Sequence, residues 1–220
     1  MRNAKMSVTI SNRTRKQERE QDRTAFPEVT NGKINTEKFL AASQQVVGLI
    51  EKFGKLFAPV KYDMQQNIDK LNTKYNSDKE SHCTLQDMIL SEKIAGESVT
   101  ATEALLWLRR GLHMIQLFFE KIIQDYKTGN ITEDLVASLK KSYKESLEPF
   151  HGWMAQQLFG LLARMIPART QLMEILTNGH EEKEEEILND MDELTKGLKK
   201  NVIALHIFYD LHNLNSNNRV

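Results

Sequence analysis

The sequence predicts an all-α protein with seven or eight helices in a single domain. Apolar residues recur three or four positions apart through most of the chain, and no stretch alternates apolar and polar residues as a strand would. Glycine and proline are scarce, with 10 and 4 among 220 residues, and 40% of the residues are apolar. The chain can therefore bury a sizeable core.

Turn-forming residues bound the first two helices. The helical pattern begins at Thr36 and stops at Gly54. Pro59 can open the second helix, because its fixed backbone angle suits a first-turn position. The apolar stripe of the second helix consists of Val60, Met64, Ile68, Leu71 and Tyr75.

A short helix and a long central helix are expected next. Thr84 and Asp87 form a capping pattern for a helix that ends near Gly96. The helix over 99–126 is apolar on most of its sides, so we expect it at the buried centre of the fold.

Three further helices complete the pattern before the last turn of the chain. Thr132 can cap a helix that runs through Tyr143, and Pro149 then interrupts the pattern. Another helix is expected over 150–166, before Pro167. A short helix follows around 172–176.

The last helix follows a turn at Asn178-Gly179. It begins in the acidic run 181–186, where carboxylates suit the positive end of a helix dipole. Its apolar stripe consists of Ile187, Met191, Leu194, Leu198, Val202, Leu205 and Phe208 or Tyr209.

Composition limits the partners and the compartment. The 30 basic and 30 acidic residues cancel, so nucleic acid is not an expected partner. Cys83 is the single cysteine, which excludes an internal disulfide and a cysteine-based zinc site. No signal peptide or membrane span is evident, so we expect a cytoplasmic protein that contacts membranes transiently at most. Residues 1–33 are polar, basic and aperiodic, and we interpret them as a mobile tail before a domain over 34–220.

Polar side chains adjoin the apolar stripe of the second helix. On a helical wheel Lys70, Asp63 and Asn67 fall at about 280°, 300° and 340°, beside a stripe that spans about 0° to 80°. An ammonium, a carboxylate and an amide in one patch suit a polyhydroxyl ligand such as a sugar. The alternative, which the spacing alone favours, is that Asp63 and Lys70 are ordinary surface charges.

Three other residues have both a structural and a functional interpretation. Trp107 lies on a different face from much of the central apolar stripe, so its ring is either part of the core or a stacking platform. His151, in the sequence PFHGW, is by default a partly buried histidine bonded to a backbone carbonyl. Trp153 suits a bilayer interface or, with the apolar residues that follow it, the core.

Three segments resemble motifs of the glycolipid transfer protein family. The segment APVKYDMQQNIDKLNTKY resembles the family's sugar-site motif. In that motif an Asp is followed by an Asn four residues later and by a Lys three residues beyond the Asn. Its central helix with a sugar-stacking Trp resembles ATEALLWLRRGLHMIQLFF, and its His-Gly-Trp motif resembles PFHGW. The resemblance covers residues 34–214. The segment ATEALLWLRRGL is particularly similar to the lipid-transfer domain of the four-phosphate adaptor proteins.

This resemblance implies a two-layer helical sandwich that encloses a hydrophobic lipid pocket and leaves the sugar at the surface. Asp63 would bond the ceramide amide N–H and a sugar hydroxyl, and Asn67 and Lys70 would bind other hydroxyls. His151 would bind the amide oxygen. Trp107 would stack on the first sugar ring.

The resemblance also implies a cargo with sugar. Relatives that carry ceramide phosphate have Lys at the place of Asn67 and Arg at the place of Trp107, as a phosphate site requires. Arg109 and Arg110 keep the phosphate alternative open, although basic residues in such positions more often reach solvent.

Three more positions follow from the same comparison with the family. Trp153 is placed at the membrane-contact face. Glu103 stands where a leucine gates the pocket in the family, and Asn218 stands where a tyrosine reaches the sugar.

Three functions compete. The first is a monomeric, non-enzymatic carrier of glucosyl-, galactosyl- or lactosylceramide between membranes, without metal or cofactor. The second is a glycolipid sensor or adaptor that reports its bound state to a protein partner. The third is a hydrolase with Asp63 and His151 as acid and base, which ranks last because neither paired carboxylates nor a nucleophile motif is present.

Overall fold

The computed structural model describes residues 25–96, 98–177, 183–216 and 219. Within these residues the chain forms eight α-helices and no strand, which confirms the all-α prediction. The helices are α2 (Thr36–Lys52), α3 (Ala58–Ser77), α4 (Leu85–Ala95), α5 (Thr100–Lys127), α6 (Val136–Ser146), α7 (Trp153–Ala163), α8 (Arg169–Leu176) and α9 (Glu184–Leu211). Two short 3-10 helices, η1 (Lys55–Phe57) and η2 (Glu148–Phe150), lie before α3 and α7.

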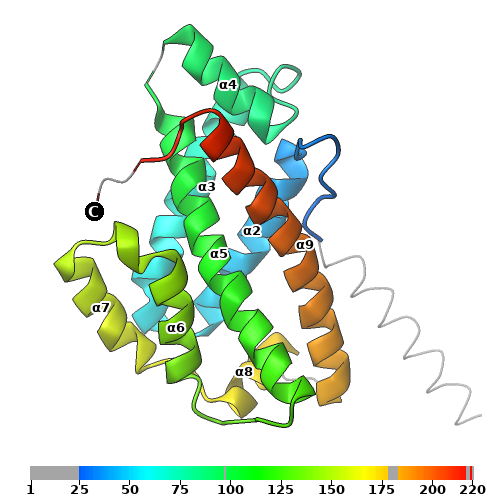
Figure 1. Cartoon of the computed structure of the whole chain (residues 1–220), viewed down its shortest axis with the longest axis vertical. Helices are drawn as coiled ribbons and strands as arrows, with labels where there is room; N and C mark the ends of the chain where they lie inside the picture. Colours follow the sequence, from blue (N-terminus) through cyan, green and yellow to red (C-terminus); the bar gives the residue numbers. More distant parts are fainter. Residues whose placement is uncertain (1–24, 97, 178–182, 217–218, 220) are drawn as a thin grey trace, which may run out of the picture.

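Helix α5 is the centre of the fold, as its apolar sequence predicts. Figure 1 shows α5 between α6 and α9, with α2 and α3 in a second layer behind them. The apolar stripe of α9 packs against α5, and both Phe208 and Tyr209 at its end are buried. Helices α3, α6 and α9 thus all pack their apolar faces against α5.

Side chains cap the N-termini of α4 and α5. Thr84 accepts a hydrogen bond from the Asp87 backbone N–H at the start of α4 (3.2 Å), as its sequence predicts. Glu92 is buried and caps α5 from outside the helix. It accepts hydrogen bonds from the Ala101 and Thr102 N–H groups (2.9 and 2.8 Å) and from the Thr102 hydroxyl (2.6 Å). These contacts satisfy donors that a helix N-terminus leaves free.

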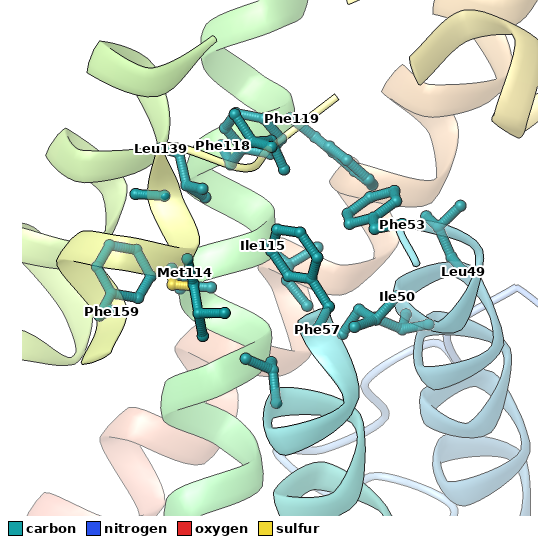
Figure 2. A pocket seen from close by; sticks show the side chains of 15 residues that line it. Leu49, Ile50, Phe53, Phe57, Met114, Ile115, Phe118, Phe119, Leu139 and Phe159 are labelled. Atoms are coloured by element: carbon teal, nitrogen blue, oxygen red, sulfur yellow. The ribbon is translucent and has the colours of Figure 1, made fainter. Parts of the chain in front are cut away.

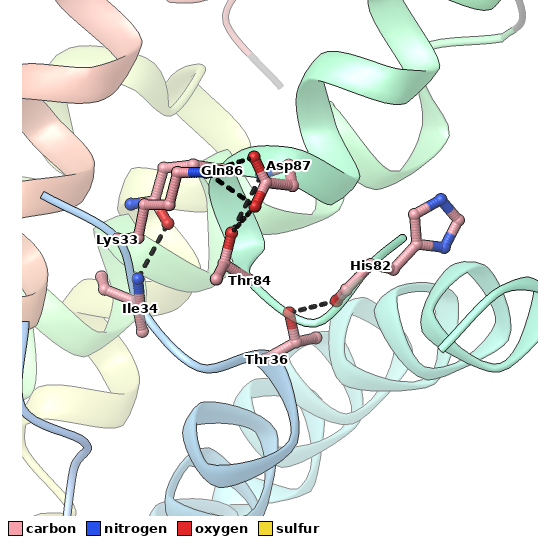
Figure 3. A network of polar contacts seen from close by, with 7 residues as sticks. All are labelled: Lys33, Ile34, Thr36, His82, Thr84, Gln86 and Asp87. Carbon is pink, nitrogen blue, oxygen red and sulfur yellow. Dashed lines mark hydrogen bonds and ion pairs between the residues drawn. The ribbon is translucent and has the colours of Figure 1, made fainter. Parts of the chain in front are cut away.

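The segment before α2 is tied to the chain around the start of α4. Figure 3 shows Lys33 paired with Asp87 (2.7 Å) and the Ile34 N–H bonded to Gln86 Oε1 (3.0 Å). Further upstream Phe26 is buried against Phe39 on α2. The expectation of a mobile tail to residue 33 therefore differs from the structure over 25–33, because Phe26 is a core anchor in an otherwise polar segment.

Two helix boundaries differ from the sequence prediction. Thr132 does not cap α6. Its hydroxyl accepts from the Asp134 N–H (3.2 Å), Asp134 accepts from the Val136 N–H (2.9 Å), and the helix begins at Val136. The helix predicted over 150–166 is the shorter α7, since η2 and the extended Gly152 delay its start. The turn at 178–179 and the start of the acidic run lie outside the described residues.

Candidate functional site

An apolar cavity lies between the two layers of helices. Its volume is ≈ 40 Å³, and all the side chains that line it are apolar. Figure 2 shows them converging from α2, α3, α5, α6 and α7, with Phe53, Phe57 and Phe118 among them. Such a lining offers no hydrogen bond, so it suits hydrocarbon and not a polar ligand.

The three polar residues predicted on the second helix lie together on α3. Asp63 and Lys70 are exposed, whereas Asn67 is buried and its Nδ2 donates to the Asp63 backbone carbonyl (3.0 Å). Neighbouring protein atoms desolvate the Asp63 carboxyl and raise its pKa, and the Lys70 charge partly offsets this rise. Among the described residues, none donates a hydrogen bond to this carboxylate. Asp63 is therefore an exposed, desolvated acceptor beside the apolar face.

Trp107 and His151 form a stacked pair. Their ring centroids lie 5.8 Å apart with planes at 20°, and Trp107 is only partly buried. The Arg110 guanidinium lies 4.7 Å from the Trp107 ring centroid and 3.5 Å from that of Phe150. The tryptophan ring thus contacts both an imidazole and a guanidinium at the edge of the core.

His151 is bonded by a side chain and not by the expected backbone carbonyl. Its Nδ1 lies 2.9 Å from the Tyr143 hydroxyl. Burial lowers the His151 pKa and the Arg110 charge lowers it further, so the ring is neutral near pH 7. Burial also raises the pKa of Tyr143 to about 12, with a smaller contribution from Glu148. Sequence analysis missed Tyr143 as a site residue, because its spacing identified it only as part of an apolar stripe.

The two arginines of α5 are buried, which corrects the expectation that they reach solvent. Arg109 lies over the Tyr209 ring (5.9 Å), and Arg110 donates from Nη2 to the Ser216 carbonyl (2.6 Å). Burial lowers the pKa of both groups, that of Arg110 to about 10 with a further contribution from Arg109, so both remain charged near pH 7. Aromatic rings from η2 and α9 make this burial possible, through cation–π contacts that sequence spacing does not reveal.

The polar groups and the cavity share the same helices. Asp63 is one turn from Val60 on α3, and Trp107 is two turns from Met114 on α5. Both Val60 and Met114 line the cavity. The helices approach closely at Gly111, where an added Cβ would lie 3.9 Å from the Met64 side chain. The structure therefore places the α3 polar group and Trp107, with its stacked His151, on adjoining helices.

Helix α7 has apolar side chains on two faces, one toward the cavity and one toward solvent. Phe159 and Leu162 line the cavity, whereas Trp153 is 73% exposed. The core interpretation of Trp153 is therefore wrong. The other exposed apolar side chains on or just after α7 are Met154, Leu158, Leu161 and Met165.

Other kinds of site find no support in the described residues. No group of three or more His, Cys, Asp or Glu side chains there could hold a metal ion. No helix within them has both the length and the apolar character of a transmembrane span.

A two-layer helical fold around an apolar cavity, with polar side chains on the helices that line it, defines the class of helical lipid-transfer proteins. Residues 34–178 match the family described as glycolipid transfer protein. A glycolipid transfer protein of Danio rerio is 32% identical over 161 residues, which are 71% of this chain and 77% of that protein. The chain belongs to the glycolipid transfer protein family.

Longer relatives and solved structures agree with this membership. Human pleckstrin homology domain-containing family A member 8 is 35% identical over 192 residues, which are 83% of this chain but 36% of that protein. The chain thus spans about a third of the length of such relatives. A structure of FAPP2, described as selecting simple glycosphingolipids with this fold, has a TM-score of 0.79 and 32% identity and covers 88% of this chain and 94% of that one. Mouse ceramide-1-phosphate transfer protein, at 18% identity and a TM-score of 0.74 over 84% of this chain and 92% of that one, shares the fold.

Proposed function

We propose that the protein is a non-enzymatic carrier that moves glycosphingolipids between membranes. The observation that carries the proposal is the partly exposed Trp107 ring, stacked on His151, on a helix whose next turns line an apolar cavity. An aromatic face suits the C–H surface of a sugar ring, and the apolar lining of the cavity suits hydrocarbon. The similarity to a glycolipid transfer protein and to FAPP2 supports this function.

Hydrogen-bonding groups around this ring give each part of the headgroup a partner. Asp63 presents a carboxylate without a donor from the described protein, which would accept from the ceramide amide N–H and a sugar hydroxyl. Asn67 keeps its amide oxygen, and Lys70 its ammonium, for other hydroxyls. His151 would bind the amide oxygen, and Trp107 would stack on the first sugar.

The burial of Arg109 and Arg110 favours a sugar headgroup over a phosphate headgroup. A phosphate site needs cations that present paired N–H groups to the ligand. Arg109 and Arg110 are instead buried against Tyr209, Trp107 and Phe150. Lys70 is then the one cation of the predicted site that is exposed.

The exposed face of α7 supports a transient membrane contact. Trp153 has an apolar ring and a polar N–H, a combination that favours the bilayer interface. Because the other face of the same helix lines the cavity, contact through α7 would bring the bilayer next to the chain-binding region. We place the carrier in the cytoplasm as a monomer, and residues 34–220 as its lipid-transfer domain.

Transfer between two populations of vesicles tests this function. Donor vesicles contain glucosylceramide, and acceptor vesicles are collected and their lipid is analysed by mass spectrometry. A carrier delivers intact glucosylceramide, a sensor binds it without delivery, and a hydrolase releases products. Asp63→Val, which removes the proposed amide acceptor, should abolish delivery while the helical circular dichroism spectrum is retained. Rapid delivery by the folded variant would show that Asp63 does not bind the lipid.

A further inference from the structure

We propose that Tyr143 is a positioning residue that fixes the tautomer of His151 and so keeps the ring proton on Nε2, where it can donate a hydrogen bond to the lipid. The part of this inference that concerns the lipid rests on the function proposed above. The tautomer itself is a property of the protein without lipid.

The contact between these two residues is held from both sides. The Tyr143 hydroxyl lies 2.9 Å from His151 Nδ1. The Tyr143 ring is stacked on Phe159, with centroids 3.6 Å apart and planes at 8°. The His151 carbonyl accepts a hydrogen bond from Gln156 Nε2 (2.9 Å), and the imidazole stacks on Trp107. Neither partner of the hydrogen bond can turn away without breaking a second contact.

The direction of the hydrogen bond follows from counting donors and acceptors. Tyr143 is 4% exposed, and among the described residues its hydroxyl has no other hydrogen-bond partner. If Nδ1–H donated to the hydroxyl oxygen, the hydroxyl proton would be buried without an acceptor, which is costly. The hydroxyl therefore donates to Nδ1. A neutral imidazole that accepts at Nδ1 carries its proton on Nε2.

The state of both groups near pH 7 agrees with this direction. Burial keeps the Tyr143 pKa at about 12, so its O–H is intact. Burial and the Arg110 charge lower the His151 pKa, so the ring is neutral. His151 Nε2 has no hydrogen-bond partner among the described residues, which leaves its N–H free for a ligand.

The chemistry of the proposed cargo requires this tautomer. The oxygen of an amide carbonyl only accepts hydrogen bonds, so it needs an N–H from the ring. The other tautomer would present a lone pair at Nε2 and repel that oxygen. Tyr143 thus acts on the lipid through His151, without touching it.

Nitrogen-15 NMR of histidine-labelled, full-length protein without lipid tests the inference. The two ring-nitrogen shifts distinguish Nε2–H from Nδ1–H, and the His151 signals are identified by their loss in His151→Gln. We expect wild type to show Nε2–H. We expect Tyr143→Phe, which keeps the ring stacked on Phe159, to shift both His151 nitrogen resonances toward a mixture of tautomers. Nδ1–H in wild type, or unchanged His151 shifts in Tyr143→Phe, would overturn the proposal.

Lipid transfer supplies the second readout. Tyr143→Phe should slow glucosylceramide transfer by about threefold to tenfold, the effect expected of one weakened hydrogen bond. Tyr126→Phe removes the hydroxyl of a different, partly buried tyrosine and should change neither the His151 shifts nor the transfer rate. Full-rate transfer by Tyr143→Phe with a shifted tautomer would overturn the role in lipid binding. Because the tautomer is measured without lipid, its result stands whether or not the protein carries glycolipid.

Discussion

Trp107 and His151 come from distant parts of the chain and stack with ring centroids 5.8 Å apart. The pair joins the central helix to the loop before α7, and Arg110 lies over the same tryptophan ring. An aromatic surface is thereby fixed beside the region that holds the apolar cavity. The predictions below test this surface and the groups around it.

Removal of the Trp107 ring should impair lipid uptake more than stability. Because the ring is only partly buried, Trp107→Ala should cost less free energy of unfolding than the roughly 3 to 5 kcal/mol of a fully buried aromatic. Loss of a stacking platform should slow glycolipid transfer by about threefold to tenfold. Thermal denaturation and vesicle transfer measure the two effects, and Trp107→Phe is the control that keeps a ring. A core-sized loss of stability with unchanged transfer would make Trp107 a packing residue.

The Asp63 carboxylate should destabilise the protein without lipid at neutral pH. Its pKa in the folded state is raised above 3.8, so its contribution to stability is most favourable below that pH and is lost as the pH rises through the folded value. Asp63→Asn should therefore raise the melting temperature at pH 7, and the gain should shrink toward pH 4.

The matched control for this experiment is Asp69→Asn, which removes the same charge from an exposed position on α3. It should not reproduce the pH-dependent gain. Asp63→Asn should also slow glycolipid transfer, since an amide is a weaker acceptor than a carboxylate. A variant at position 63 that is less stable than wild type at pH 7 would contradict the assigned desolvation.

Trp153 should act on membrane binding and not on folding. Trp153→Ala should leave the free energy of unfolding within about 0.5 kcal/mol, because the side chain is 73% exposed. Its loss should weaken vesicle binding by about tenfold, as expected for an aromatic ring removed from an interface. Ile94→Ala removes an apolar side chain that is 86% exposed on α4 and should not affect vesicle binding. Equal effects of the two variants in a vesicle sedimentation assay would count against a specific α7 contact.

Glu92 should be a structural residue that holds the start of the central helix. Its carboxylate accepts three hydrogen bonds in a buried position, so Glu92→Ala should cost about 1.5 to 3 kcal/mol or more in urea denaturation. Glu103→Ala removes an exposed carboxylate from the first turn of the same helix and should cost about 0.5 kcal/mol at most. Similar losses from both variants would show that the cap is unimportant.

Periodicity was sufficient to predict most of the helices. The apolar stripe of α9 and the turn signals at Gly54, Pro59 and Gly96 are local features, so they can be recognised in the sequence. Phe26 was missed because its burial depends on contacts with α2 and α9, which lie far along the chain. Thr132 was misassigned because a threonine that forms a turn and one that caps a helix have the same local sequence.

The site was less predictable, because its contacts join separate elements. The burial of Arg110 requires Phe150 and the Ser216 carbonyl, which no spacing on α5 indicates. The partner of His151 was expected to be a backbone carbonyl, whereas it is the hydroxyl of Tyr143. The sequence was sufficient to predict that the polar residues of α3 lie together. Their direct role in lipid binding stays a prediction.

Competition between two lipids in one vesicle assay tests the proposed sugar specificity most directly. Donor vesicles contain glucosylceramide and ceramide phosphate at equal mole fraction, with matched acyl chains, and the lipid that reaches the acceptor vesicles is quantified over time. The partly exposed Trp107 ring, and arginines held against aromatic side chains, predict that wild-type protein moves glucosylceramide faster. Faster movement of ceramide phosphate would contradict a sugar-binding site.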